Sequence, residues 1–284
     1  MASHTHRGAT PPTTEYLPQA VLWDMDGTLV DTEVHWFAAE AELMAAHNIA
    51  WGHQDSLDMV GSSEENTIRT MQAHGLPLSG PQIVEGLHSR VLSGIHRDLP
   101  LRPGALDLLL ECHAAGVPTA LVTNSGSTLA TAVLDQLTVM ARERGWMGEQ
   151  LFEVVVTGDL GLPGKPAPAP YVFAARRLAA LQAEGRQAAD TATSLEPGQM
   201  VAIEDSVTGI RSARDAGVTA VGVVHLTSLA DADAHVLLDT LDGVTVTDLG
   251  TCVQRAQNVE PGQGGVASSH HTWQQSAPKD QDTP

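Results

Sequence analysis

The sequence is short of the residue types that mark several other classes of protein. Its 284 residues include 2 cysteines, Cys112 and Cys252, which form neither a metal-binding spacing nor a disulfide framework. Lys and Arg number 15 against 34 Asp and Glu, for a formal net charge of −19 at pH 7, and no basic run occurs. We therefore expect no nucleic-acid partner.

Long hydrophobic runs are also missing. No apolar stretch reaches the length needed to cross a membrane, and residues 1–17 lack the apolar segment of a secretory signal peptide. These absences predict a cytoplasmic protein with no membrane partner. Residues 1–17 are rich in Thr, Pro and His, and residues 251–284 in Gln, Gly and Ser, so we expect both ends to be disordered tails. The hydrophobic content of 42% supports a real core between them.

An apolar run from Ala20 to Trp23 ends abruptly in two carboxylates, Asp24 and Asp26, and Gly27 follows. A buried strand needs no acids at its end, but phosphoryl transfer does, because one carboxylate can attack phosphorus while the other handles the leaving-group proton. Both can help to hold Mg²⁺, which prefers oxygen ligands. Gly27 permits a tight turn and lets backbone N–H groups approach an anion. Taken alone, the segment is also compatible with a strand and an ordinary acidic turn.

Two further segments carry weaker signals. The run Val117–Ser125 ends in Thr123, Asn124 and Ser125, whose hydroxyl and amide groups can donate to phosphate oxygens. Capping of the following helix explains this run better when it is taken alone, and both roles are compatible. Lys165 lies between Gly164 and Pro166 on a restricted loop, where it can offer a fixed positive charge to a carboxylate and a phosphate.

A second acidic pair, Glu204 and Asp205, ends the apolar run that begins at Met200. Asp205 could supply another carboxylate to a metal, although an acid at this place also suits the start of a helix. In parallel α/β sheets, ligands bind beyond the carboxyl ends of the strands. The polar groups that follow each apolar run would therefore converge at one edge of the sheet, although they are distant in sequence.

Alternation of apolar runs with helical patterns predicts an α/β fold with a doubly wound parallel sheet. We expect strands at residues 20–24, 119–123, 153–157, 201–204, 220–224 and 235–238, and helices at residues 104–115, 127–144, 170–184 and 207–216. Between residues 32 and 99 the pattern is helical throughout, which predicts an inserted α-helical cap. The catalytic core is then expected at residues 18–31 and 100–250, and two linkers beside a catalytic strand suit a lid that opens and closes.

Taken in order, Asp-x-Asp-Gly-Thr, Thr-Asn, Gly-Lys-Pro and Glu-Asp resemble the motifs of the haloacid dehalogenase superfamily. The likeness covers residues 19–249 and is greatest to the branch of Mg²⁺-dependent small-molecule phosphatases and β-phosphoglucomutases with a helical cap. It implies a Rossmann-like core with the cap inserted after the first strand. A dehalogenase would attack with one Asp and need no metal, so the two acidic pairs argue against that activity.

The resemblance also implies roles for individual residues. Asp24 would attack phosphorus and form an aspartyl-phosphate, and Asp26 would serve as general acid and then as general base. Mg²⁺ would be held by Asp24, the backbone carbonyl of Asp26 and Asp205, with Glu204 bound to the metal directly or through water. Phosphate oxygens would be bound by the following residues: Gly27, Thr123, Asn124 and Lys165, the last of which would bridge Asp24 and the phosphate.

These observations predict a phosphomonoester hydrolase that acts, as a monomer, on a small-molecule phosphate ester, with a sugar phosphate as the best guess. The runner-up is a β-phosphoglucomutase, and a catalytically silent binding module is a third alternative. Mutases of the family carry a His at the cap entry and an Arg in a later cap segment, where this chain has Trp36 and Glu64. An acid at the second position would repel a second phosphate, which favours the phosphatase.

Overall fold

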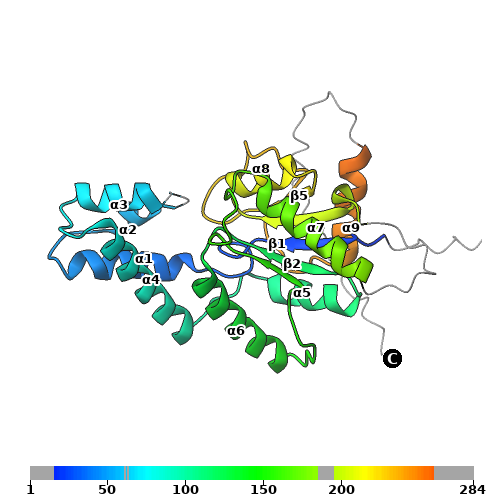
Figure 1. Cartoon of the computed structure of the whole chain (residues 1–284), viewed down its shortest axis with the longest axis horizontal. Helices are drawn as coiled ribbons and strands as arrows, with labels where there is room; N and C mark the ends of the chain where they lie inside the picture. The colour runs from blue at the N-terminus through cyan, green and yellow to red at the C-terminus, as the bar shows by residue number, and fades with distance from the viewer. Residues whose placement is uncertain (1–15, 61, 63, 185–194, 259–284) are drawn as a thin grey trace, which may run out of the picture.

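The computed structural model describes residues 16–60, 62, 64–184 and 195–258 of the chain (Figure 1). Within these residues, parallel strands form one sheet in the order β3-β2-β1-β4-β5-β6. The strands are β1 (Ala20–Trp23), β2 (Thr119–Val122), β3 (Val154–Val156), β4 (Met200–Glu204), β5 (Thr219–Val223) and β6 (Val236–Leu238). The predicted doubly wound α/β fold is confirmed, with β1 in the middle of the sheet.

Helices cover both faces of this sheet, which is why its central strands are continuous apolar runs. Every residue of β1 is buried, and successive side chains face opposite ways: Val21 and Trp23 pack in one hydrophobic cluster, Ala20 and Leu22 in another. The first cluster includes residues of α5 (Ala105–Ala114), α6 (Ser127–Glu143) and α9 (Val246–Asn258), and the second includes residues of α7 (Ala169–Glu184) and α8 (Val207–Asp215). A 3₁₀ turn, η1 (Pro197–Gln199), leads into β4.

The segment after β1 forms helices that stand apart from the sheet, at the opposite end of the molecule from α9 (Figure 1). They are α1 (Glu33–Ala45), α2 (His53–Leu57), α3 (Glu64–Ala73) and α4 (Gly80–Arg97), and we refer to them as the cap helices. Buried side chains of α1, such as Leu43, and of α4, such as Leu87 and Val91, pack together. Among the described residues, no helix has the length and hydropathy needed to cross a bilayer.

The two chain segments that join the cap helices to the core lie side by side. Val30 forms an antiparallel bridge with Leu101, and the backbone N–H of Asp31 donates to the carbonyl of Pro100 at 2.8 Å. The side chain of Asp31 lies 3.3 Å from Nε2 of His225, which follows β5. The cap helices therefore connect to the sheet directly beside the end of β1.

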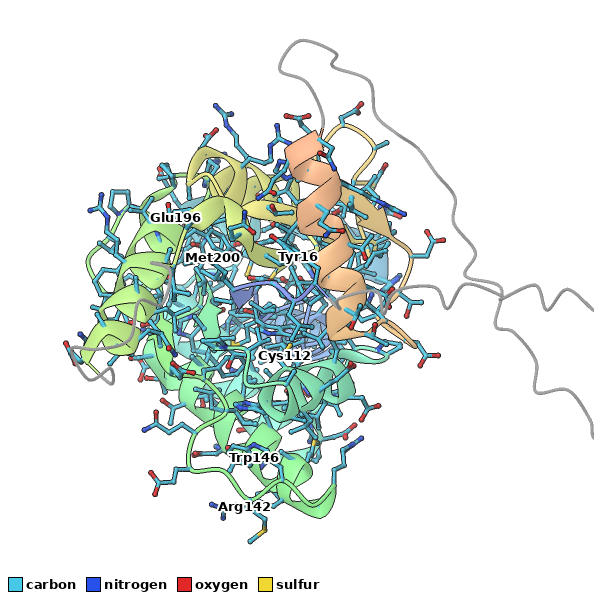
Figure 2. The ribbon with its side chains drawn as sticks, turned by 90° about the vertical axis from the view of Figure 1, so that its right-hand side faces the viewer. Tyr16, Cys112, Arg142, Trp146, Glu196 and Met200 are labelled. Carbon is cyan, nitrogen blue, oxygen red and sulfur yellow. The ribbon has the colours of Figure 1, made fainter. Side chains whose placement is uncertain are left out.

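The C-terminal tail begins later than the sequence suggested. Helix α9 continues to Asn258, and Cys252 and Val253 are buried, so a tail that starts at residue 251 does not fit the structure. Besides packing against the sheet and α5, helix α9 contacts the start of the described chain: Tyr16 lies beside this helix (Figure 2), and a side chain at Gly250 would lie 1.7 Å from the Tyr16 carbonyl oxygen. Residues 1–15 and 259–284 of the predicted tails lie outside the described residues.

Candidate active site

The polar groups singled out in the sequence meet at the carboxyl edge of the sheet. Asp24 follows β1, Thr123 follows β2 and Glu204 ends β4, and Lys165 reaches them from the loop between β3 and α7. Nζ of Lys165 lies 2.6 Å from Oδ1 of Asp24 and 2.6 Å from Oε1 of Glu204. These residues are separated by up to 180 positions in sequence, so the topology of the sheet brings them together.

Lys165 is the fixed positive charge of the site. Its ammonium group donates to Asp24, to Glu204 and, at 2.7 Å, to the carbonyl of Val122. All three protons are therefore engaged, and the side chain is only 4% exposed. Burial alone would lower the pKa of Lys165, but the charges of Asp24 and Glu204 outweigh it and raise that pKa above its ordinary value. Lys165 stays charged at any physiological pH.

Glu204 is the buried member of this network. It is fully buried, and Oε1 also accepts a hydrogen bond from the Tyr171 hydroxyl at 2.7 Å, while Oε2 accepts one from Ser206 at 3.1 Å. Burial, followed by the charge of Glu204, raises the pKa of Tyr171 well above its usual range, so this hydroxyl stays a donor. Gly209 makes room for the carboxylate, because a Cβ there would lie 1.9 Å from Glu204.

Asp24, Glu204 and Asp205, which we call the core carboxylates, offer oxygens that all lie within 4.8 Å of one another. Among the described residues, no group donates a hydrogen bond to the Asp205 side chain. Burial and then the charges of Asp24 and Glu204 raise the pKa of Asp205 to about 9. Gly27 has a φ of +80°, and a Cβ on it would lie 2.0 Å from Oδ2 of Asp205. Clustered, like-charged oxygen donors of this kind suit a hard divalent cation.

Asp26 occupies a different environment two residues away. Its carboxyl group accepts hydrogen bonds from the hydroxyls of Thr32, of Thr123 at 3.3 Å and of Ser125 at 2.7 Å. Burial and the charge of Asp24 raise the pKa of Asp26, whereas these hydroxyl bonds act in the opposite direction. The net direction is upward, which favours the protonated acid.

Asn124 engages the loop that carries Lys165. Its Oδ1 accepts from the backbone N–H of Lys165 at 2.9 Å, and its Nδ2 donates to the carbonyl of Lys165 at 3.3 Å. Two glycines leave room for Asn124. A Cβ on Gly164 would lie 3.0 Å from Oδ1 of Asn124, and a Cβ on Gly158 would lie 2.0 Å from the backbone carbonyl oxygen of Asn124. In this arrangement the amide of Asn124 fixes the position of Lys165. Its expected contact with phosphate stays a prediction.

Reasoning from the sequence missed two side chains that contact the site, Thr32 and Tyr171. Ser125 belongs to the polar run after β2 that the sequence singled out, whereas Thr32 stands at the cap entry with nothing to mark its bond to Asp26. Tyr171 lies in α7 with a fully buried ring, and helical spacing alone gives a buried tyrosine a packing role. Its hydroxyl bond to Glu204 becomes visible only in three dimensions.

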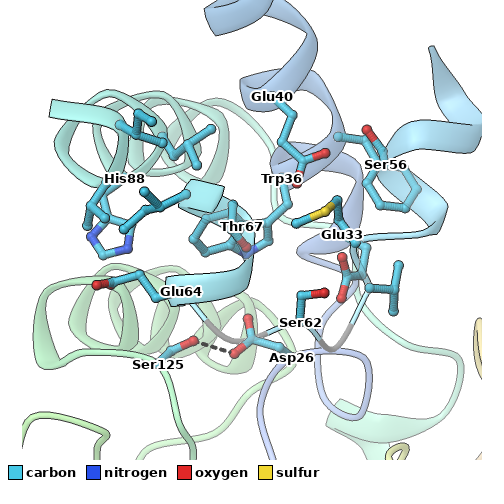
Figure 3. A pocket seen from close by; sticks show the side chains of 17 residues that line it. Asp26, Glu33, Trp36, Glu40, Ser56, Ser62, Glu64, Thr67, His88 and Ser125 are labelled. Atoms are coloured by element: carbon cyan, nitrogen blue, oxygen red, sulfur yellow. Dashed lines mark hydrogen bonds between the residues drawn. The ribbon is translucent and has the colours of Figure 1, made fainter. Parts of the chain in front are cut away.

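A cavity of about 240 Å³ opens from Asp26 toward the cap helices (Figure 3). Asp26 and Ser125 line it from the core side, and Glu33, Trp36 and His88 are among the residues that line it from the cap. Ligand pockets usually measure about 300–1,000 Å³, so this one suits a small molecule. A group attached to a phosphate beside Asp24 would extend into this space.

Comparisons with known proteins identify the family of this chain. A family model described as haloacid dehalogenase-like hydrolase matches residues 18–217. The chain is 30% identical to the plasmid-encoded protein CbbY of Cupriavidus necator over 78% of this chain and 84% of that one. It is 25% identical to hexitol phosphatase B of Escherichia coli K12, over 81% and 96% of the two chains. The crystal structure of CbbY from Rhodobacter sphaeroides with phosphate superposes with a TM-score of 0.64 at 26% identity, over 80% and 96%.

Proposed function

Because the chain belongs to the haloacid dehalogenase-like hydrolases, several relatives of which are named phosphatases, we propose that it hydrolyses phosphate monoesters of a small metabolite. One observation carries the proposal: two carboxyl groups of the same loop have opposite environments. Asp24 contacts the Lys165 ammonium at 2.6 Å, whereas Asp26 is surrounded by hydroxyls and its pKa is raised by burial. Such a pair supplies a charged nucleophile and a proton donor together.

The proposed reaction has two steps. In the first, an oxygen of Asp24 attacks phosphorus in line, and Asp26 gives its proton to the oxygen of the leaving alcohol as that bond to phosphorus breaks. In the second, Asp26 takes a proton from water, which attacks the aspartyl-phosphate and restores Asp24. Oδ1 of Asp24 is held by Lys165, and among the described residues no group donates to Oδ2, which makes Oδ2 the attacking atom.

Mg²⁺ is the proposed cofactor, and the core carboxylates fit it. Asp24, Asp205 and the backbone carbonyl of Asp26 would be its direct ligands. Both oxygens of Glu204 already accept hydrogen bonds, so we place Glu204 behind the metal, in contact through water. The bound cation would neutralise charge on the phosphate and on the carboxylates.

Phosphate oxygens would be bound by donors that already point to the edge of the sheet. Thr123 and Ser125 have hydroxyls on Asp26 and could turn to a phosphate bound between Asp24 and Asp26. Lys165 contributes charge. The expected contact of phosphate with the backbone at Gly27 does not fit the structure, because the N–H of Gly27 donates to the carbonyl of Val30 at 2.8 Å and that of Leu29 donates to the carbonyl of Met25 at 3.0 Å. Asn124 acts by holding the Lys165 loop, with its exposed side chain also within the polar run that follows β2.

For the substrate, we propose a phosphate ester of a sugar or polyol. One relative is named a hexitol phosphatase, and the cavity beside Asp26 accommodates a group of that size. Glu64 lines this cavity, so a second phosphate there would face a carboxylate. This placement disfavours the mutase alternative, which needs a bisphosphate in the site.

The experiment is hydrolysis of p-nitrophenyl phosphate with Mg²⁺, with EDTA, and by Asp24→Asn. We expect turnover with Mg²⁺ alone and none by the variant. Rapid quenching with a radioactive phosphate ester should label the wild-type protein, and hydroxylamine should release the label, because it cleaves acyl-phosphates. Equal turnover in metal-free buffer, or by Asp24→Asn, would overturn the proposal.

A further inference from the structure

The cavity beside Asp26 is lined by several carboxyl groups, with His88 as the basic side chain among its described lining residues. Glu33, Glu40 and Glu64, which we call the cap carboxylates, line it together with Asp26 (Figure 3). Of the described residues that line this cavity, none is Lys or Arg. A neutral sugar requires no such cluster of carboxyl groups, and an anionic leaving group would be repelled by those that are ionised.

Two of these carboxylates are held within the cavity rather than at its rim. Glu40 is 5% exposed and accepts hydrogen bonds from Nε1 of Trp51 at 3.3 Å and from the side chain of Ser56. Glu33 lies in the first turn of α1, and among the described residues no side chain or backbone group donates to its carboxylate. Burial, and then the charges of Asp26, Asp31 and Glu40, raise the pKa of Glu33 to about 7. A ligand cation would give Glu33 the partner that the described chain does not provide.

Much of the remaining wall is apolar or aromatic, and hydroxyl side chains and His88 complete it. Trp36 and Phe37 line the cavity on α1, and the Trp36 ring meets His88 of α4 edge to face, with ring centroids 5.7 Å apart. Aromatic faces attract cations as well as apolar surface, and the attraction grows when water is excluded. Carboxylates beside aromatic rings are a combination that binds a protonated amine.

We propose that the preferred substrate is a phosphate monoester whose small leaving alcohol carries a protonated amine, such as an amino sugar or amino alcohol. The inference rests on the proposed phosphatase activity and specifies its substrate class. The phosphate would bind at Asp24, and the amine would lie among the cap carboxylates. The cavity of about 240 Å³ limits the leaving group to about the size of one sugar ring.

Two matched substrate series test this at pH 7 with saturating Mg²⁺. Glucosamine 6-phosphate, glucose 6-phosphate and 6-phosphogluconate share a six-carbon skeleton and carry an amine, no extra charge and a carboxylate. Phosphoethanolamine and phosphoglycolate are the corresponding two-carbon pair. We expect kcat/KM to fall about tenfold at each step from amine to neutral to carboxylate, since complementary charge favours one partner and like charge rejects the other.

Variants locate the preference in the cavity. Glu33→Gln and Glu40→Gln should each reduce the ratio of kcat/KM for amine over neutral ester about threefold to tenfold, mainly through KM. Two variants are needed because Glu40 also holds Trp51 and its loss can disturb the fold. Glu42→Gln is the matched control, because Glu42 is on the same helix but lies 3.7 Å from Arg90 and outside this cavity. It should leave the ratio unchanged.

Outcomes separate the two proposals. Hydrolysis of p-nitrophenyl phosphate without any preference for the amine in either series would overturn the inference and leave the phosphatase standing. A preference that survives Glu33→Gln and Glu40→Gln unchanged would overturn it as well. Failure to hydrolyse every ester, p-nitrophenyl phosphate included, would overturn the proposed function and this inference with it.

Discussion

The core carboxylates and the cap carboxylates are both clusters of acidic side chains, yet their surroundings differ. The core cluster has Lys165, whose ammonium bridges two of its members at 2.6 Å, and a tyrosine hydroxyl that fixes Glu204. The cap cluster has no Lys or Arg among the described residues of its cavity. A cluster with an internal cation is organised before any ligand arrives, whereas the other must obtain its positive charge from the ligand.

This difference separates chemistry from selection. Changes in the core cluster should affect every substrate alike, because they touch the nucleophile, the metal ligands or their fixed partner. Changes in the cap cluster should redistribute activity among substrates. Each of the following predictions tests whether a change affects all substrates alike or alters the preference among them.

The largest effect should come from the nucleophile. Asp24→Asn replaces a carboxylate by an amide, which cannot form the acyl-phosphate, so we expect kcat to fall by a factor of at least about 10⁴ on every ester. The measurement is phosphate release with Mg²⁺ present. Asp31→Asn is the control, because Asp31 follows the same loop but its side chain contacts His225. This variant should keep kcat within about threefold of the wild-type value. Equal losses in both variants would show that any acid in this loop matters equally.

Removal of the internal cation should come next. Lys165→Ala leaves Asp24 and Glu204 without their shared partner, and we expect a loss of about 2–4 kcal/mol of transition-state stabilisation. This corresponds to a fall of about 30-fold to 10³-fold in kcat/KM, similar for amine, neutral and anionic esters. A loss confined to one class of ester would place Lys165 in substrate selection and contradict its role in the core cluster.

The metal should also appear in the pH dependence of stability. The pKa of Asp205 is about 9 in the folded protein against an ordinary 3.8, so the metal-free folded state binds more protons than the unfolded state between these values. Stability without metal should therefore fall as pH rises from about 4 to 9. Mg²⁺ supplies the missing charge, so it should raise Tm more at pH 8 than at pH 5, by about 5–10 °C at saturation.

Asp205→Asn is the control for this measurement. The amide carries no charge to neutralise, so the extra increase at pH 8 should disappear together with most of the Mg²⁺ effect. Calorimetry or a thermal fluorescence scan in buffers of equal ionic strength would decide it. A larger Mg²⁺ effect at pH 5 in the wild type would contradict the assignment of the core cluster as the metal site.

Much of the core was predictable because each of its strands has a recognisable local sequence pattern. Parallel strands buried on both faces must be apolar along their length, and the polar residues that end them, such as Asp24 and Glu204, stand out by contrast. The order of these runs was enough to infer the sheet. The contrast between apolar and polar residues did not reveal the end of α9, because Cys252 and Val253 are buried in a segment of mixed composition.

Contacts made by ordinary residue types were not predictable. Tyr171 holds Glu204 from another helix, and Thr32 reaches Asp26 from the cap entry. Neither residue type is unusual at its position, and only the packing of distant segments gives it a role. The cap presents the same difficulty, because helical spacing indicated helices there but not that Glu33 and Glu40 would face one cavity.

The smallest effect, and the most selective, should come from Glu64, an exposed member of the cap cluster in the first turn of α3. Glu64→Arg adds a cation to the cavity, so we expect kcat/KM to rise about threefold to tenfold for 6-phosphogluconate and to fall similarly for glucosamine 6-phosphate.

Glu65→Arg is a close control for this substitution. Glu65 lies in the same turn of α3, is also exposed and lies outside the cavity lining. The substitution therefore shares any cost of a cation at a helix N-terminus, about 0.3–1 kcal/mol. Glu65→Arg should leave kcat/KM for 6-phosphogluconate and for glucosamine 6-phosphate unchanged.

Glu64→Arg should also strengthen binding of glucose 1,6-bisphosphate without making a mutase, because Trp36 stands where a mutase of this family has a His. The measurement follows glucose 6-phosphate and free phosphate separately from glucose 1-phosphate with the bisphosphate present. Rapid formation of glucose 6-phosphate by the wild type with little phosphate released would mean that the cap already retains a second phosphate, and the contrast between the two clusters would then be wrong.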